Sequence, residues 1–137
     1  MRRGQAAFEF LSYFTFFLLI FIVIFTYMGS EQAREIRVRE FEISKEITDN
    51  FASEVNLAVS VGDGYKRTFT FPTKILGKTN YSVFYRKGFV ELTWSRGEDK
   101  FVYFSPLSTD NVTEFAVDVE KGYLRLNNTR GVIYIKQ

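Results

Sequence analysis

Residues 1–28, MRRGQAAFEFLSYFTFFLLIFIVIFTYM, decide how this chain is organised. From Phe10 to Met28 the sequence contains no charged residue, no Gly and no Pro. At about 1.5 Å per residue, a helix of this length spans the roughly 30 Å hydrocarbon core of a bilayer. The sequence therefore predicts a membrane-spanning helix at this end. Because Arg2 and Arg3 precede the span, the positive-inside rule places the N-terminus in the cytoplasm and the residues after Met28 outside.

The basic segment in front of the span predicts a short leader. An ordinary secretory signal has its cleavage site after the apolar core, but here Gly29-Ser30-Glu31 and a charged helical sequence follow. The small-residue junction beside a basic segment is Gly4–Gln5. Cleavage there would remove residues 1–4 and leave the apolar helix at the new N-terminus.

The letters RGQAAFEFL around this junction resemble the class III signal peptide of archaeal type IV pilins. Gly4 before the cut, Gln5 after it and Glu9 as the fifth mature residue match the family motif, whereas Ala7 stands where the family has Ser and Tyr13 where it has Leu. The resemblance implies that a prepilin peptidase cleaves after Gly4 while the arginines hold the leader in the cytoplasm.

The same resemblance implies assembly partners and an oligomeric state. The mature protein would wait in the membrane until a pilus assembly ATPase and a platform membrane protein draw it into a helical homo-oligomeric filament on the cell surface. Adhesion would reside on the outer surface of this filament. The expected filament-core residues are the apolar side chains Phe8, Phe10, Leu11, Phe14, Phe17, Leu18, Phe21, Ile22 and Phe25.

Glu9 is the carboxylate that begins the apolar run. A charge at the centre of a membrane helix costs about 2.5–3.5 kcal/mol, and less near the interface. In the pilin-like interpretation, cleavage creates an amine on Gln5 that meets Glu9 of the same or a neighbouring subunit and sets the register of assembly. In the alternative interpretation, Glu9 lies hydrated at the headgroup level and has no role.

Beyond the membrane, residues 29–61 predict an amphipathic continuation of the helix, which ends at the turn Gly62-Asp63-Gly64. The predicted buried stripe is Ile36, Ile43, Ile47, Phe51, Val55 and Ala58. Residues 62–137 predict about seven short strands separated by turns such as Lys87-Gly88. The expected strands are 66–71, 80–86, 89–95, 100–104, 112–119, 123–127 and 132–136.

Alternation in the last strands predicts sheets with one buried face. The positions that indicate this face are Phe115, Val117, Val119, Val132 and Tyr134. That face would pack on the 43–55 part of the helix. The expected fold class is therefore α+β, a long N-terminal helix packed at its outer half on a small antiparallel domain, as in type IV pilins.

Composition argues against several function classes. The chain has no Cys and no His, so the usual catalytic triads, thiolate nucleophiles and common zinc sites cannot form, and we expect neither an enzyme nor a cofactor. Residues 66–137 hold twelve basic and seven acidic side chains, but the basic residues are scattered singly along the sequence. We therefore expect a solvated surface there and no nucleic-acid partner.

Two alternatives to a pilin remain open from the sequence. One is a bitopic membrane protein that does not polymerise and whose outer domain binds a ligand or partner. The other is a minor pseudopilin of a secretion or uptake machine. Three glycosylation sequons, at Asn80, Asn111 and Asn127, fall outside the span and agree with an external location in all of these interpretations.

Overall fold

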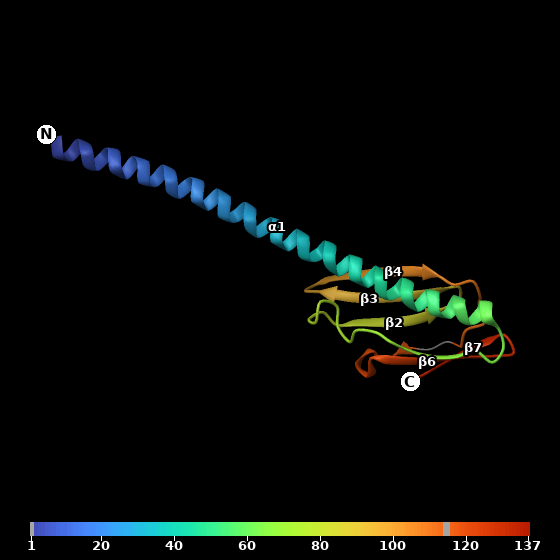
Figure 1. The fold of residues 1–137 in the computed structure, drawn as a ribbon. Coiled ribbons are helices and arrows are strands. Elements are labelled where there is room, and N and C mark those ends of the chain that lie inside the picture. The colour runs from blue at the N-terminus through green and yellow to red at the C-terminus, as the bar shows by residue number, and fades with distance from the viewer. Residues whose placement is uncertain (1, 114–115) are drawn as a thin grey trace. The chain divides into compact units, whose positions relative to one another are not determined.

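The computed structural model describes residues 2–113 and 116–137. Helix α1 extends over Arg2–Val61, so it joins the predicted span and its predicted continuation over residues 29–61 in one element (Figure 1). Contacts within the chain define two compact units, Met1–Arg39 and Glu40–Gln137. The elements that follow α1 are β1 (Lys66–Thr70), β2 (Tyr81–Arg86), β3 (Phe89–Arg96), β4 (Asp99–Pro106), β5 (Ala116–Val117), the 3₁₀ turn η1 (Val119–Lys121), β6 (Tyr123–Thr129) and β7 (Val132–Lys136).

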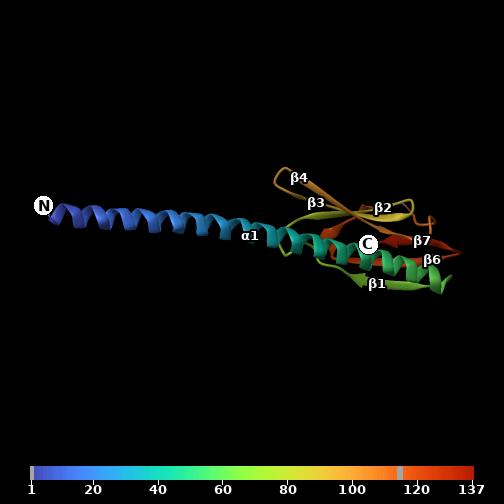
Figure 2. The same ribbon diagram turned by 90° about the horizontal axis from the view of Figure 1, so that it is seen from above.

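The strands of the second unit form two antiparallel sheets. One sheet has the order β1-β6-β7 and the other has the order β4-β3-β2-β5. Hairpins join β2 to β3, β3 to β4 and β6 to β7, whereas β1 pairs with the distant β6. Figures 1 and 2 show the part of α1 after Glu40 running alongside both sheets. The predicted α+β class is confirmed.

The core of the second unit forms where α1 meets the sheets. Phe51 is fully buried, and its ring lies 5.0 Å from the rings of both Phe69 and Phe71. The predicted stripe is confirmed from Ile43, which is half-buried, through the buried positions 47, 51, 55 and 58. For Ile36 it is wrong, since this residue belongs to the first unit and is 41% exposed.

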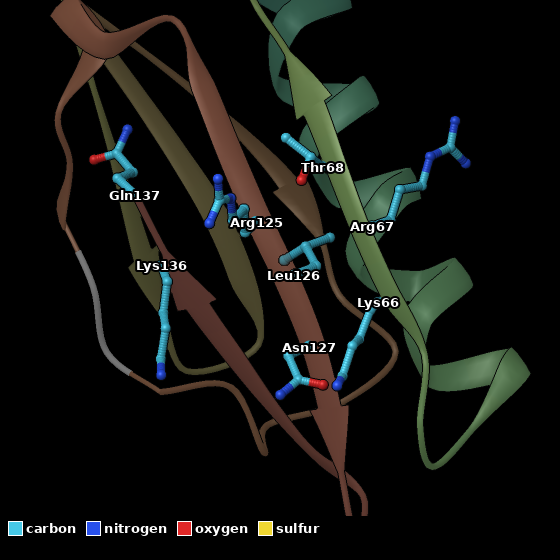
Figure 3. Close-up of a pocket in the computed structure, with 8 residues that line it drawn as sticks. All are labelled: Lys66, Arg67, Thr68, Arg125, Leu126, Asn127, Lys136 and Gln137. Carbon is cyan, nitrogen blue, oxygen red and sulfur yellow. The ribbon is translucent and has the colours of Figure 1, made fainter.

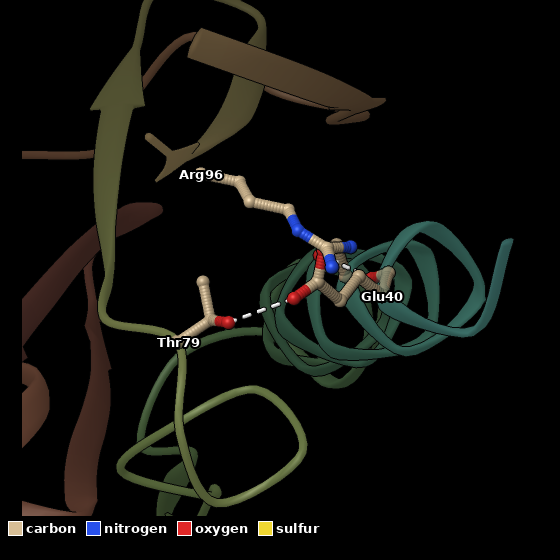
Figure 4. A network of polar contacts seen from close by, with 4 residues as sticks. Glu40, Thr79 and Arg96 are labelled. Carbon is tan, nitrogen blue, oxygen red and sulfur yellow. Dashed lines mark hydrogen bonds and ion pairs between the residues drawn. The ribbon is translucent and has the colours of Figure 1, made fainter. Parts of the chain in front are cut away.

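Polar side chains are also buried along this face of α1, which the hydrophobic pattern did not predict. Ser44 and Thr48 each donate a hydrogen bond to the carbonyl oxygen four residues earlier, so their hydroxyls need no water. The carboxylate of Glu40, 5% exposed, accepts a hydrogen bond of 2.8 Å from Thr79 and lies 3.5 Å from the Arg96 guanidinium (Figure 4). This contact holds the β3–β4 hairpin and the loop before β2 to the helix.

The end of α1 is the predicted glycine turn. Gly62 has a φ of +88°, a conformation that favours glycine, and its N–H donates to the carbonyl of Ala58 at 3.3 Å. The carboxylate of Asp63 accepts a hydrogen bond of 2.7 Å from the backbone N–H of Arg130. The turn after the helix is therefore tied to the β6–β7 turn.

Two strand predictions need correction. Among the described residues, the expected strand 112–119 is reduced to β5, Ala116–Val117, which ends where Asp118 accepts a hydrogen bond from the N–H of Glu120 and starts the turn η1. Val117 and Val119 are buried as expected, whereas Phe115 lies outside the described residues. In β7 the buried face is the opposite of the predicted one. Ile133 and Ile135 are buried and Tyr134 is exposed, because pairing with β6 sets which face meets the core.

Candidate functional site

The first unit, as far as the structure describes it, presents an apolar helix whose large side chains are exposed. The large apolar side chains between Phe8 and Met28 are between 40% and 73% exposed. The most apolar 18-residue window has a mean hydropathy of 2.4, and none of it is buried. A helix that is apolar on all faces is stable only in lipid or against other protein surfaces. In length and composition it could cross a membrane, which indicates membrane insertion or secretion.

The hydroxyl groups within this span are compatible with a lipid environment. Ser12, Thr15 and Thr26 each donate to the backbone carbonyl four residues earlier, at 2.8–2.9 Å. Since hydrocarbon offers no hydrogen-bond partners, a polar group in the bilayer must be satisfied within the helix. The span therefore tolerates these Ser and Thr hydroxyls at little cost.

These hydroxyl residues also share one side of the helix. At about 100° per residue, Phe10, Phe14, Phe17 and Phe21 lie within roughly 60° of one another, and the hydroxyl residues 12, 15 and 26 lie on the opposite side. The rings of Phe10 and Phe14 stack with their centroids 6.3 Å apart. One side of the span is therefore a ridge of phenylalanines, and the other carries the three small hydroxyl side chains together with the larger Phe8 and Leu19, an arrangement that the sequence analysis had missed.

Glu9 and Gln5 lie one helical turn apart, as the sequence predicts. The side-chain amide of Gln5 donates a hydrogen bond of 3.2 Å to the exposed carboxylate of Glu9. The expected ionic partner, an amine on Gln5, exists only in a chain cleaved after Gly4. The structure thus places position 5 within reach of Glu9, while the register role of Glu9 stays a prediction.

The expected cleavage site lies within α1, since the helix begins at Arg2 and the Gly4–Gln5 bond has helical backbone conformation. The side chains of Arg2 and Arg3 are outside the part of the chain that the structure describes. Cleavage after Gly4 therefore stays a prediction. The nine predicted filament-core residues from Phe8 to Phe25 are all at least half exposed and free to contact other molecules.

The predicted glycosylation sequons differ in accessibility. The side chains of Asn80 and Asn111 are exposed, whereas Asn127 on β6 is half-buried. A glycan on Asn80 or Asn111 would point into solvent without disturbing the core. Asn127 is the least accessible of the three.

The second unit also contains buried ionisable groups. Tyr81 is 6% exposed and its hydroxyl donates to the carbonyl of Pro72, while the hydroxyl of Tyr85 has no hydrogen-bond partner among the described residues. Burial raises the pKa of both hydroxyls, so both stay neutral at ordinary pH. In the described ranges 2–113 and 116–137, no group of three or more carboxylates could hold a metal ion.

The fold is pilin-like in architecture, because a long N-terminal apolar helix continues into a segment that packs on small antiparallel sheets. The resemblance of residues 3–11 to a class III signal peptide is a separate, local observation. Comparison of the chain with protein-family models, with curated proteins and with solved structures found no match.

Proposed function

We propose that this chain is a structural pilin subunit of an archaeal type IV pilus-like surface filament. The observation that carries the proposal is the exposed apolar segment of α1 on a chain whose second unit has its own complete core. Such a helix needs lipid before assembly and other helices after it. A filament of many copies supplies those helices.

Maturation by a prepilin peptidase would prepare the helix for assembly. Cleavage after Gly4 removes the basic leader and leaves a positive amine on Gln5. Because this amine lies one turn from Glu9, the two groups can pair within one subunit or between neighbours. In a setting of low dielectric constant, an unpaired carboxylate is costly, so packing registers that pair it are favoured.

The two sides of the span suggest how copies pack. Close approach of membrane helices requires small side chains at the contact, and the hydroxyl residues Ser12, Thr15 and Thr26 provide them. The phenylalanine ridge from Phe10 to Phe21 of one copy would pack into the gaps that Ser12 and Thr15 leave between the larger side chains on the opposite side of the next copy. The unit Glu40–Gln137 would then form the outer surface of the filament, where adhesion would occur.

The mature N-terminus of the native protein is the first test. We expect Gln5 as the first residue in protein isolated from its own cells, as measured by N-terminal sequencing or mass spectrometry. An intact Met1 would contradict the pilin proposal and favour the bitopic protein that does not polymerise. Electron microscopy of the cell surface would separate a major pilin, present as abundant filaments, from a minor pseudopilin.

Two substitutions test the mechanism. Gly4→Leu should block processing, whereas Gly29→Leu should not, because a side chain at position 29 meets nothing within 4 Å. Unchanged maturation of Gly4→Leu would argue against the cleavage site.

Glu9→Ala should be processed and inserted but should assemble poorly, with Glu31→Ala as a control outside the span. A normal filament yield from Glu9→Ala would refute the register role.

A further inference from the structure

A groove on the outward face of the β1-β6-β7 sheet gathers basic residues that are far apart in the sequence. Its volume is about 370 Å³, within the size range of ligand pockets. The strand register places Thr68, Arg125 and Lys136 in one row across the three strands, and Lys66 beside Asn127 in the next row. Figure 3 shows these side chains along the groove.

Two like charges lie on neighbouring strands of this groove. Arg125 and Lys136 are direct cross-strand partners, and like charges at directly opposite positions of a sheet are destabilising. Figure 3 shows their charged groups pointing toward opposite ends of the groove. The Arg125 guanidinium lies 5.9 Å from the ring centre of Tyr123, whereas the Lys136 ammonium points the other way, toward the end where Lys66 lies. Positive charge is thus spread along the groove rather than focused on one point.

Within the described residues, no acidic side chain neutralises these charges. No Asp or Glu side chain lines the groove, and within the described residues none of Lys66, Arg125 and Lys136 takes part in an ion pair. Arg67 also borders the groove, but its guanidinium pairs with Glu54 of α1 at 3.3 Å. The groove therefore carries three cations available to an anionic ligand.

The wall of the groove is held in place before any ligand binds. The side-chain amide of Gln137 donates to the carbonyls of Asp118 and Tyr123, at 2.7 and 3.1 Å, and its oxygen accepts from the N–H of Asp118 at 2.7 Å. The remaining lining residues lie on paired strands. A preformed site loses less conformational entropy on binding than a flexible one.

We infer that this groove binds an acidic polysaccharide, a chain of sugars that carries carboxylate or sulfate groups. Spaced cations suit an extended polyanion, and the hydroxyl of Thr68 and the amide of Asn127 suit sugar hydroxyls. Single-stranded nucleic acid would stack its bases on aromatic rings, and the two tyrosines of this sheet face, Tyr123 and Tyr134, lie outside the groove lining. Three cations are also few for duplex DNA, whose binding relies on many phosphate contacts.

This inference deepens the proposed adhesive function and rests on it only for the external location of the second unit. Binding can be measured on the full chain in an uncharged detergent, where no filament is needed. Failure of the binding test therefore leaves the pilin proposal standing, and failure of filament assembly leaves the groove untouched.

The test compares fluorescently labelled dextran sulfate with unsulfated dextran of the same length by anisotropy. We expect salt-sensitive binding of dextran sulfate and no binding of dextran. The triple variant Lys66→Gln, Arg125→Gln, Lys136→Gln should lose at least about tenfold in affinity, equivalent to about 1.4 kcal/mol. The control variant Lys74→Gln, Lys87→Gln, Lys100→Gln removes the same net charge at exposed positions outside the groove and should retain binding.

Three results would overturn the inference. Equal binding of both dextrans would show that charge is not recognised. Equal losses in the two triple variants would show that net charge, and not the groove, attracts the polymer. The chain could also bind a DNA duplex more tightly than dextran sulfate and lose that binding in the triple variant at Lys66, Arg125 and Lys136. That result would assign the groove to nucleic acid. Circular dichroism of both triple variants verifies that they are folded.

Discussion

Replacing Asn128 with Ala tests the link between the end of α1 and the β6–β7 hairpin. Asn128 is 2% exposed, and its side-chain nitrogen donates a hydrogen bond of 2.8 Å to the carbonyl of Ala58 in the last turn of the helix. Its side-chain oxygen accepts a bond of 3.1 Å from the N–H of Gly131. Asn128→Ala removes both bonds at once.

The expected loss follows from these two contacts. A hydrogen bond contributes about 0.5–1.5 kcal/mol to the free energy of unfolding, so two contribute about 1–3 kcal/mol. The loss of stability is not larger, because both former partners of Asn128 can still form hydrogen bonds. The carbonyl of Ala58 still accepts from the N–H of Gly62 at 3.3 Å, and the N–H of the exposed Gly131 can donate to water. With a urea m-value of about 2 kcal/mol/M, the unfolding midpoint should fall by roughly 0.5–1.5 M.

The assay uses the single tryptophan of the chain. Trp94 is 4% exposed and its ring stacks on Phe101, so unfolding in urea changes its fluorescence. Asn127→Ala is the matched control, because this half-buried neighbour lies on the outward face of the same strand and, in the part of the chain that the structure describes, forms no side-chain hydrogen bond to the helix. We expect it to stay within about 0.5 kcal/mol of the parent chain. Equal midpoints for the two variants would refute the reasoning.

Three further substitutions probe the second unit. Phe51→Ala removes a fully buried ring and should lower the free energy of unfolding by about 3–5 kcal/mol in the same urea titration. A loss below about 1 kcal/mol would contradict the placement of Phe51 in the core. Burial raises the pKa of Tyr85, so folding stability should be fully present below about pH 10 and decline above it as the unfolded tyrosine ionises. Tyr85→Phe should reduce this alkaline decline in stability without lowering stability at neutral pH, because the Tyr85 hydroxyl has no hydrogen-bond partner among the described residues. If thermal melts of the variant showed the same dependence of melting temperature on pH as the parent chain, the role of Tyr85 would be refuted. Glu40→Ala should lower the free energy of unfolding by about 1–2 kcal/mol, because it removes the contacts with Thr79 and Arg96. Glu40→Gln can still accept the hydrogen bond from Thr79 and should lower it by less, and the urea midpoints of the two variants would show the difference.

The helix, the turns and most strand positions were predictable because their signals are local. The apolar run to Met28 and the spacing of Ile47, Phe51 and Val55 each specify a helix within a few turns. Lys87-Gly88 sits between two alternating segments, and the structure places a two-residue turn there, with a Gly88 φ of +86°. These features depend on neighbours in the chain and not on the rest of the fold.

Burial on β7 shows where local pattern was insufficient. The strand Val132–Lys136 has apolar residues on both faces, so alternation alone cannot select the inner one. The structure buries Ile133 and Ile135, because Ile135 pairs with the buried Leu126 of β6 and Ile133 pairs with the buried Asn128. Likewise, Glu40 is a surface residue by composition and is buried only because Thr79 and Arg96 reach it from distant segments.

By itself, the sequence determined that this chain has a long apolar helix, an amphipathic continuation and a set of short strands, since hydrophobic period and turn residues act over a few positions. Only the tertiary structure decided that β1 pairs with β6. That single long-range pairing brings Lys66 beside Asn127 and completes the basic groove with Arg125 and Lys136. The physical reason is that strand pairing is selected by how well the complete sheet faces pack against the helix. The free energy of that packing depends on residues far apart in the chain, so no short segment of sequence determines it.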